Sequence, residues 1–338
     1  RKHHLIIIIF IMTSEIDTAS SYYALTKQIY AEQAGLQHRK QQSSGEEKNS
    51  TNNQIWVEDN WTEEEISHVA EILSSEKPAL RAKAHQIQKY EAEAALNWDR
   101  FYTRNQSNFF KDRHYLQRVF PELSVERLSD TSSSCGPFVL LEVGCGVGNA
   151  VLPLLEKNPN LHVWGLDLSH VAIDLMRQDE RFANASRQGR AKAAVWDITA
   201  GSCPLICTNT NVEHVEGAAD GAILLFCLSA VTPEKMKDAV RNVIDTLKPG
   251  GCLLFRDYGR FDEAQMKLGT SRGKCLGDNF YVKQDGTRCY YFDLDDIRAM
   301  FSELEEVELS YIRRVYSNRG DQSVRRRVWI HGRFRKPQ

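Results

Sequence analysis

Short apolar runs, separated by longer mixed stretches, recur through the middle of the chain. Five such runs cover residues 138–143, 161–166, 192–196, 220–226 and 252–257. Runs of this length, rich in Val, Ile and Leu, are typical of strands that are buried on both faces of a sheet. We therefore expect an α/β fold in which helices connect these strands and cover both faces of a mostly parallel sheet.

Turn-forming residues are expected to end the last connecting helix and to form a hairpin beyond it. The Leu-Lys-Pro-Gly-Gly sequence at 247–251 stops a helix well, and an apolar run follows it directly. Residues 279–292 predict two strands around an Asp-Gly turn. Strands near 307–313 and 325–334 would complete the sheet.

The N-terminal segment has a different composition. Residues 13–55 are rich in Gln, Ser and Asn, and this composition predicts that residues 1–55 are disordered and lack fixed structure. The apolar run at 5–12 is much shorter than the roughly 20 residues that span a bilayer, so we expect no membrane segment. Because the chain begins with Arg1, Met12 is the expected natural start.

A helical lobe is expected over residues 56–130. Thr62, with a Glu three residues later, predicts a helix start, and a second helix is expected over 79–96, continuing towards Phe101. The stretch 129–137, with four Ser, a Gly and a Pro, is typical of a linker. The expected division into an N-terminal segment, a helical lobe and a main domain is 1–55, 56–130 and 131–338.

Composition excludes some classes of function. The chain has 338 residues and a net charge of −2, so no global basic field attracts it to nucleic acid. Its eight cysteines form no Cys-x-x-Cys pair. Cys203 and Cys207 lack a second pair or a nearby His, so no metal site is expected. Free thiols fit a reducing compartment, and the cytoplasm is the expected location.

A glycine turn follows the first apolar run, with Gly144, Gly146 and Gly148 spaced as Gly-x-Gly-x-Gly. This spacing differs from the dinucleotide fingerprint, and no Gly-Lys-Ser/Thr sequence is present for a triphosphate. Glycines let the backbone approach a ligand where a Cβ atom would clash. The alternative is an ordinary tight turn, in which Cys145 is a small residue that fills the turn and not a nucleophile.

The ends of the next three strands carry candidate ligand-binding residues. Asp167 and Asp197 follow the second and third strands, and Leu225 lies at the end of the fourth. In an open parallel sheet, ligands bind outside the carboxyl ends of the strands, where a carboxylate can hold ribose hydroxyls. We expect Asp167 at the ribose and Asp197 with Ile198 at an adenine edge; the alternative for each Asp is an acid that caps a turn.

Three further groups of residues suggest a nucleic-acid substrate. Aromatic and cationic residues alternate between Trp98 and His114, as in sites that stack bases and hold phosphates. Residues 313–336 contain nine cations and one acid, which favours a polyanion footprint. The Arg256-Asp257-Tyr258 sequence lies at the end of the fifth strand, at the same edge of the sheet where a ligand is expected to bind. For the first group the alternative is an aromatic face that packs on the core. For residues 313–336 it is a solvated strand edge, and for Arg256-Asp257-Tyr258 it is an ion pair that fixes the loop.

These motifs together resemble the tRNA 3-methylcytidine methyltransferases, a family of class I S-adenosylmethionine-dependent enzymes. The similarity covers about residues 56–337 and is closest to the branch that acts on threonine tRNA. The motifs that carry it are Trp98-Asp99-x-Phe101-Tyr102, Phe109-Phe110-Lys111-Asp112-Arg113-His114, Leu141–Asn149, Leu228-Ser229-Ala230-Val231, Leu247–Gly251, Arg256-Asp257-Tyr258-Gly259 and Phe280–Arg288.

The resemblance implies a Rossmann-like sheet of seven mostly parallel strands with an N-terminal helical RNA-binding extension. It also implies methyl transfer from S-adenosylmethionine, leaving S-adenosylhomocysteine, to N3 of cytosine 32 in the anticodon loop. Threonine tRNA is the expected substrate, with arginine and serine tRNAs as alternatives. An accessory protein such as an aminoacyl-tRNA synthetase is a candidate partner. The alternative functions are a protein or small-molecule methyltransferase and a non-catalytic RNA-binding subunit.

The sequence and the resemblance together give three sets of candidate residues. The cofactor set is Trp98, Tyr102, Gly144, Gly146, Gly148, Asp167, Asp197, Ile198 and Leu225. The RNA set is Phe109, Phe110, Lys111, Arg113, His114, Arg325, Arg326 and Arg327. The catalytic set is Asp257, Arg256 and Tyr258, in which Asp257 is expected to stabilise the positive charge that develops on the base.

Overall fold

The computed structural model describes residues 54–58, 62–74, 80–124, 128, 136–205, 217–318 and 324–338. The described residues divide into two compact units. Unit 1 takes in residues up to Arg81 together with Phe261–Cys275 and Ile312–Val328. Unit 2 comprises Ala82–Arg260, Leu276–Tyr311 and Trp329–Gln338. The expected helical lobe is therefore shared between both units, and most of the expected N-terminal segment lies outside the described residues.

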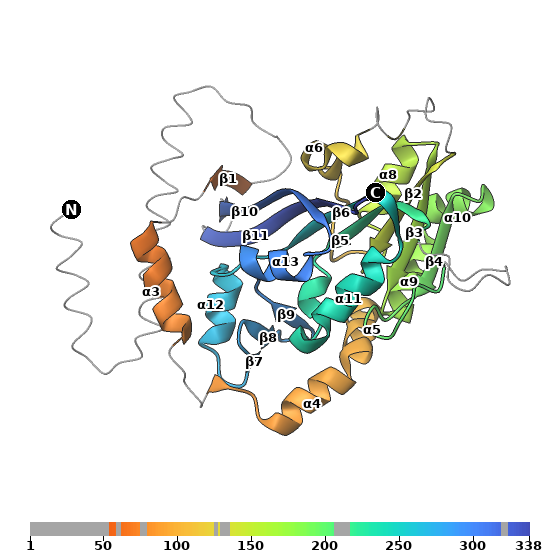
Figure 1. The fold of residues 1–338 in the computed structure, drawn as a ribbon. Helices are drawn as coiled ribbons and strands as arrows, with labels where there is room; N and C mark the ends of the chain where they lie inside the picture. Colours follow the sequence, from red (N-terminus) through yellow and green to blue (C-terminus); the bar gives the residue numbers. More distant parts are fainter. Residues whose placement is uncertain are drawn as a thin grey trace, which may run out of the picture. The chain divides into compact units, whose positions relative to one another are not determined.

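Unit 2 is built on a mostly parallel sheet with the strand order β10-β11-β6-β5-β2-β3-β4 (Figure 1). Of the first two strands it contains the part of β10 up to Tyr311 and the part of β11 from Trp329. The β2·β3, β3·β4, β2·β5 and β5·β6 pairs are parallel, and β11 runs antiparallel to β6. This topology confirms the expected α/β fold. The strands are β2 (Phe138–Val143), β3 (Leu161–Asp167), β4 (Ala191–Val195), β5 (Ala219–Leu225), β6 (Leu247–Tyr258), β10 (Glu305–Asn318) and β11 (Val324–Arg335).

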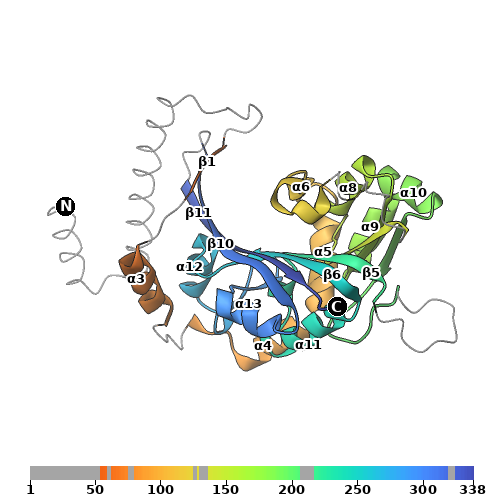
Figure 2. The same cartoon turned by 45° about the horizontal axis from the view of Figure 1, so that its top comes forward.

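Helices cover both faces of this sheet because its strands are apolar on both sides. Along β2, Leu141 and Val143 join one buried cluster, whereas Leu140 joins another. The first cluster includes residues of α11 and α13, and the second includes residues of α6, α8, α9 and α10 (Figure 2). The helices are α6 (Leu116–Val119), α8 (Val151–Lys157), α9 (His170–Gln178), α10 (Glu180–Arg187), α11 (Pro233–Ile244) and α13 (Leu294–Met300).

The long helix expected over 79–96 is instead two helices. Lys83 precedes α4 (Ala84–Ala92), and Glu93, at φ −95° and ψ 15°, separates α4 from α5 (Ala94–Asn105). Asp99 fixes α5 against α9, because its carboxylate accepts a hydrogen bond of 2.6 Å from the Ser169 hydroxyl at the start of α9. A short 3₁₀ helix, η2 (Pro121–Leu123), follows α6.

The expected helix stop at 247–251 also differs in the structure. α11 already ends at Ile244, and residues 247–251 form the first part of β6, where Leu247 pairs with Ala219. The pairing shifts register between Ala219 and Gly221, which accommodates the Pro-Gly-Gly sequence inside a strand. A second 3₁₀ helix, η3 (Leu228–Ala230), follows β5.

The expected hairpin is confirmed. β8 (Phe280–Val282) pairs antiparallel with β9 (Arg288–Tyr290), and Lys283 N donates to Thr287 O across the turn. Asp285 stabilises the turn by accepting hydrogen bonds from the backbone and hydroxyl of Thr287. β7 (Cys275–Gly277) is the third strand of this small sheet.

Unit 1 contains β1 (Gln54–Glu58), α3 (Glu63–Ser74) and α12 (Glu263–Gly269). β1 pairs antiparallel with the Arg314–Asn318 part of β10. Its first two residues lie in the segment 1–55, which we expected to lack structure. A polar sequence gives little sign of such a strand, because β1 is held by pairing with the backbone of β10. α3 begins directly after Thr62, as predicted.

In the described ranges, no helix combines the length and the apolar character that a bilayer crossing requires. No group of three His, Cys, Asp or Glu side chains suited to a metal ion occurs in that part of the chain either.

Candidate active site

A pocket of about 270 Å³ lies at the carboxyl ends of the parallel strands, and all its lining residues belong to unit 2. Of the nine residues in the cofactor set, eight line it: Trp98, Tyr102, Gly144, Gly146, Asp167, Asp197, Ile198 and Leu225. They come from α5 and from the ends of β2, β3, β4 and β5, so the sheet topology brings together residues that are far apart in sequence.

Two glycines in the turn after β2 are required by backbone conformation and by close approach. Gly144 and Gly146 have φ values of +70° and +54°. A Cβ atom on Gly146 would lie 2.5 Å from the Tyr102 hydroxyl oxygen, and one on Gly144 would lie 2.6 Å from the Cys227 sulfur. The absence of these Cβ atoms leaves backbone exposed to the pocket, where a ligand can approach it closely.

Gly148 and Cys145 serve the packing of the turn. Gly148 does not line the pocket, and a Cβ atom on it would lie 2.7 Å from Leu152 in α8. Cys145 lines the pocket but is 5% exposed, and burial raises the pKa of its thiol. The thiol therefore stays protonated, in agreement with its interpretation as a residue that fills the turn and not a nucleophile.

Asp167 connects the glycine turn to the end of β3. Its Oδ2 accepts a hydrogen bond of 2.8 Å from Gly146 N, and its Oδ1 accepts one of 2.9 Å from Ser169 N. Burial raises the pKa of Asp167 to about 6, against the opposing effect of these two bonds. Each carboxylate oxygen can accept a further bond, so Asp167 can hold the turn and bind a hydroxyl pair as well.

Asp197 follows β4, the last strand at this end of the sheet. Its Oδ1 accepts hydrogen bonds from the backbone and hydroxyl of Thr199, at 2.9 and 2.7 Å. The role that we considered as an alternative, an acid that caps a turn, is thus present. It fixes the loop that carries the pocket residue Ile198, which is 7% exposed.

Glu142 is a pocket residue that the sequence analysis missed. It is 4% exposed, and burial raises its pKa to about 8, with Arg113 opposing the shift. Its Oε2 has no hydrogen-bond partner among the described residues. The Val151 backbone amide donates to the same carboxylate, so only one oxygen is left unsatisfied, and a buried carboxylate in this state favours a positive charge beside it. The available signal was an acid inside the otherwise apolar run at 138–143.

A second missed group surrounds Glu91 at another part of the pocket lining. The Glu91 carboxylate accepts hydrogen bonds from Thr232 and Arg288, and it lies 2.6 Å from the Lys235 ammonium. Burial alone would raise the pKa of Glu91, but these partners lower it to about 2. The contact joins α4 to α11 and β9. No local pattern in the sequence pairs these four side chains.

The aromatic residues of α5 and of the loop that follows it also lie at the pocket. Trp98 and Tyr102 stack with ring centroids 6.1 Å apart, and both line the pocket. Tyr102 is 5% exposed, and burial raises its pKa. Phe110 and Arg113 line the same pocket. Trp98 and Arg113 therefore line the same pocket as the Gly146 turn.

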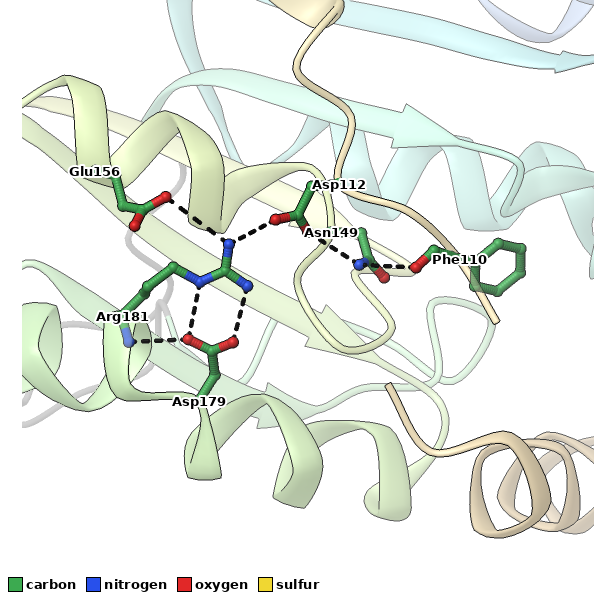
Figure 3. Close-up of polar contacts among 6 residues, drawn as sticks. All are labelled: Phe110, Asp112, Asn149, Glu156, Asp179 and Arg181. Atoms are coloured by element: carbon green, nitrogen blue, oxygen red, sulfur yellow. Dashed lines mark hydrogen bonds and ion pairs between the residues drawn. The ribbon is translucent and has the colours of Figure 1, made fainter. Parts of the chain in front are cut away.

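Asn149 holds the loop that carries Phe110 and Arg113 (Figure 3). Its carbonyl accepts a hydrogen bond of 2.7 Å from Arg113 N. Its side-chain amide donates to Phe110 O at 3.2 Å and to the Asp112 carboxylate at 3.1 Å. The residue that ends the glycine-rich motif thus positions the loop 110–113 as well.

Arg181 holds the same loop from α10 (Figure 3). Its Nη1 donates to Asp112 at 2.7 Å and lies 3.8 Å from Glu156, while its Nε and Nη2 both bind Asp179. These partners raise the pKa of Arg181, with the Asp179 hydrogen bonds as the largest cause. The bidentate pair fixes the guanidinium so that its remaining nitrogen meets Asp112.

We expect Arg181→Gln to loosen the loop 110–113 without unfolding the sheet. The affinity for the cofactor should fall about 3- to 10-fold, because a partly exposed ion pair stabilises by only about 1 kcal/mol. Hydrogen exchange at the Arg113 amide should become faster while exchange in β2 and β5 stays unchanged. Arg241→Gln, which removes a surface ion pair with Asp238 and Glu303, is the matched control. Equal exchange at Arg113 in both variants would contradict this role.

Asp257, expected to be catalytic, is buried away from the pocket lining. It is 0% exposed, and its two oxygens accept hydrogen bonds of 2.9 Å from Ser229 N and Tyr258 N. Burial raises its pKa to about 6, and these bonds lower it. In this position Asp257 fixes η3, which directly follows the pocket residues Phe226 and Cys227.

Arg256, the second member of the catalytic set, does not line the pocket either. It is 6% exposed, and its guanidinium lies 5.5 Å from the Tyr115 ring and 5.8 Å from the Phe120 ring. Its Nη2 donates to His331 Nδ1 at 3.2 Å. Burial of the His331 imidazole and the positive charge of Arg256 together lower its pKa to about 4. The imidazole is therefore neutral and can accept the bond.

The RNA set is divided by the structure. Phe110 and Arg113 line the pocket, and Phe109, Lys111 and His114 are exposed, with Phe109 at 57%. In unit 1, Arg325 is exposed, whereas Arg326 is 3% exposed and Arg327 donates to the buried Asp262 at 2.8 Å. The side chain of Arg326 therefore has little surface to offer to a phosphate.

Acids from distant parts of the sequence neutralise several of the C-terminal cations. Arg333 binds Glu122 at 2.7 Å and Glu308 at 3.0 Å, both in unit 2. Arg327 is paired with Asp262 in unit 1. A local count of nine cations against one acid therefore overstates the unpaired positive charge of this segment.

Comparisons with known proteins agree with this site. Residues 141–253, which carry the glycine turn and both strand-end acids, match a methyltransferase domain family. A SAM-dependent methyltransferase structure from Anabaena variabilis superposes with a TM-score of 0.50 and 15% identity, over 72% of this chain and 94% of that one. This likeness concerns the fold. S-adenosylmethionine is the cofactor of this methyltransferase domain. The glycine turn, Asp167 and the free Oε2 of Glu142 fit an adenosyl group that carries a cation.

Curated relatives are similar over most of the chain. The tRNA N(3)-cytidine methyltransferase METTL2 of Xenopus tropicalis is 35% identical over 315 residues, which is 84% of this chain and 89% of the relative. The tRNA N(3)-cytidine methyltransferase METTL6 of Mus musculus is 40% identical over 277 residues, 79% of this chain and 92% of the relative. By this similarity in sequence and coverage, the chain belongs to the family of tRNA N(3)-cytidine methyltransferases.

Proposed function

We propose that this enzyme methylates N3 of cytidine 32 in the anticodon loop of threonine tRNA, with arginine and serine tRNAs as alternative substrates. The observation that carries the proposal is the meeting of Trp98, Arg113 and the Gly146 turn at one pocket. It places an aromatic and cationic segment, suited to an unstacked base and its phosphates, beside the cofactor site. The choice of tRNA is supported by sequences that resemble the threonine-tRNA branch, namely the region of Trp61, Phe120-Pro121-Glu122-Leu123 and Arg327-Val328-Trp329-Ile330.

The chemistry places modest demands on the protein. When bound, S-adenosylmethionine supplies a methyl group on a sulfonium. Neutral cytosine has a lone pair on N3 and no proton there, so no side chain needs to act as a base. The glycine turn and Asp167 orient the adenosyl group, and the base must leave its stack to expose N3. Asp257, whose oxygens accept hydrogen bonds from two backbone amides, holds the start of η3 and does not line the pocket.

The proposal is tested by analysing the nucleosides of tRNA from cells that lack the protein, sorted by isoacceptor. We expect 3-methylcytidine to be lost from threonine tRNA and to return when the gene is restored. In a matched assay, the purified enzyme should methylate an anticodon stem-loop with cytidine at position 32 and leave the same loop with uridine there unmodified, because uracil N3 carries a proton. Normal 3-methylcytidine in every isoacceptor would contradict the proposal.

Two further expectations accompany this function. We propose a cytoplasmic location, in keeping with the free thiols of the described cysteines. We also propose that an accessory protein, such as an aminoacyl-tRNA synthetase, presents the tRNA. Co-purification of the enzyme with and without tRNA, followed by identification of the bound proteins, tests the second of these.

A further inference from the structure

Phe226 has an unusual backbone conformation at the edge of the cofactor pocket. It follows the last residue of β5, lines the pocket and has a φ of +55°. Bulky residues avoid this left-handed region, so the surrounding structure must hold it there. One such restraint is the 2.7 Å hydrogen bond from Phe226 N to Arg256 O in β6. Strain of this kind is retained where a side chain has to take a particular position.

Other aromatic rings support the Phe226 ring. The Tyr258 ring centroid lies 5.2 Å from it at 50°, and the Trp329 ring lies 6.5 Å away at 78°. Tyr258 in turn contacts Tyr291 at 5.7 Å and lies 5.2 Å below the Lys283 ammonium. Tilted and edge-on contacts fix the orientation of an aromatic ring and still leave one of its faces for a planar partner.

Arg113 covers the Phe226 ring. Its guanidinium carbon lies 5.1 Å from the ring centroid, and both residues line the pocket. The backbone of Arg113 is bound to Asn149, but its long side chain can rotate about several bonds. A planar guanidinium stacks on an aromatic face in the same manner as a nucleobase. The separation leaves no room for a base between them, since a base needs about 3.5 Å on each side.

We propose that Phe226 is the stacking platform for the everted cytosine and that Arg113 is a removable cover which occupies this platform until RNA enters. The inference rests on the proposed tRNA substrate. In this arrangement the base replaces the guanidinium on the Phe226 ring, next to the Gly144–Cys227 side of the cofactor pocket. The displaced guanidinium then binds an RNA phosphate. One side chain thus covers the apolar ring in the free enzyme and stabilises the RNA once it is bound.

The platform is tested with Phe226→Leu and Phe226→Tyr, using an anticodon stem-loop that carries the fluorescent base pyrrolocytosine at position 32. We expect Phe226→Leu to lower kcat/KM for the unlabelled stem-loop roughly 10- to 100-fold, the range that loss of a base–aromatic stack produces. Quenching of the fluorescent base on binding should be lost as well. Phe226→Tyr, which keeps the ring, should retain both. The assays use saturating S-adenosylmethionine, and its affinity for each variant is measured by calorimetry, so that a change in cofactor binding is distinguished from a loss of base stacking. Phe280→Leu is the matched control, since Phe280 also lies below an arginine, Arg288 at 5.5 Å, but does not line the pocket.

The cover is tested with Arg113→Ala, which should change the affinities for two ligands in opposite directions. Free cytidine, which has no phosphate, should bind more tightly because the ring is uncovered. The stem-loop should bind more weakly, and the slope of log affinity against log salt should decrease by about one phosphate contact. Weaker binding of both ligands would overturn the idea of a cover.

The inference and the function on which it rests fail in different ways. If the wild-type enzyme methylates no tRNA, the proposed function is wrong. If the wild type methylates the stem-loop and Phe226→Leu does so with unchanged kcat/KM and unchanged quenching, the function stands and the platform is wrong. Thermal unfolding of each variant, compared with Phe280→Leu, separates a loss of stacking from a loss of folding.

Discussion

Substitution of Gly146 by Ala is expected to raise the dissociation constant for S-adenosylmethionine by about 100-fold or more. A Cβ atom there would lie 2.5 Å from the Tyr102 hydroxyl oxygen and 3.3 Å from its Cζ, inside the pocket. The residue would also hold a left-handed φ of +54°, which costs about 1–2 kcal/mol for an L-residue. Isothermal titration calorimetry with the cofactor measures the effect directly.

Two further variants separate the clash from the backbone strain. Tyr102→Phe in the Gly146→Ala background removes the oxygen that the Cβ atom meets, so we expect it to restore part of the affinity. Gly189→Ala places a Cβ atom at a similar φ of +73° with nothing within 4 Å. It should lower stability slightly and leave cofactor binding intact. If Gly146→Ala binds the cofactor as well as Gly189→Ala does, the close approach at Gly146 is unimportant.

Glu142→Gln is expected to remove a large pH dependence of stability. Burial raises the pKa of Glu142 from 4.5 to about 8, so between these pH values the folded state binds a proton that the unfolded state has lost. The stabilising contribution is therefore complete below pH 4.5 and is lost as the pH rises to 8. Across that window the free energy of unfolding of the wild type should fall relative to the Gln variant by about 3–5 kcal/mol. Urea unfolding of both proteins without cofactor, at several pH values, tests this.

The same group should make cofactor binding dependent on pH. A cation favours the ionised carboxylate, so wild-type affinity should rise up to about tenfold per pH unit until the pH reaches the pKa of about 8. The ratio of wild-type to Glu142→Gln affinity removes any titration of the ligand itself. Glu234→Gln, at an exposed acid in the first turn of α11, should behave as the wild type. A ratio that is constant from pH 6 to 8 would show that Glu142 does not meet the positive charge of the cofactor.

Local sequence patterns determined the sheet and one side of the pocket. The five apolar runs became β2 to β6, because a strand buried on both faces must be apolar at nearly every position. The glycine turn and Asp167 could also be located, since a left-handed turn requires glycine and the ends of parallel strands meet at one edge. The family motifs then pointed to Trp98 and Tyr102, although nothing local places α5 beside the turn.

Tertiary packing alone decided the state of each charged group. Asp257 and Arg256 lie near the carboxyl end of β6, next to β5, yet neither lines the pocket, and they are buried against Ser229 and His331. Glu142 lies within an apolar run, and only the folded pocket shows that it has an oxygen without a partner. The end of α11 at Ile244, ahead of the Pro-Gly-Gly sequence, was set by the pairing of Leu247 with Ala219.

The sequence by itself determined what depends on neighbours along the chain, namely the strands, the turn and the family motifs. Tertiary structure decided what depends on partners far apart in sequence, such as Arg113 on Phe226 and Arg181 on Asp112. The physical reason is that a charge or an aromatic face takes its role from the groups within a few ångströms of it. Burial then determines how strongly that contact counts, and burial is a property of the folded chain.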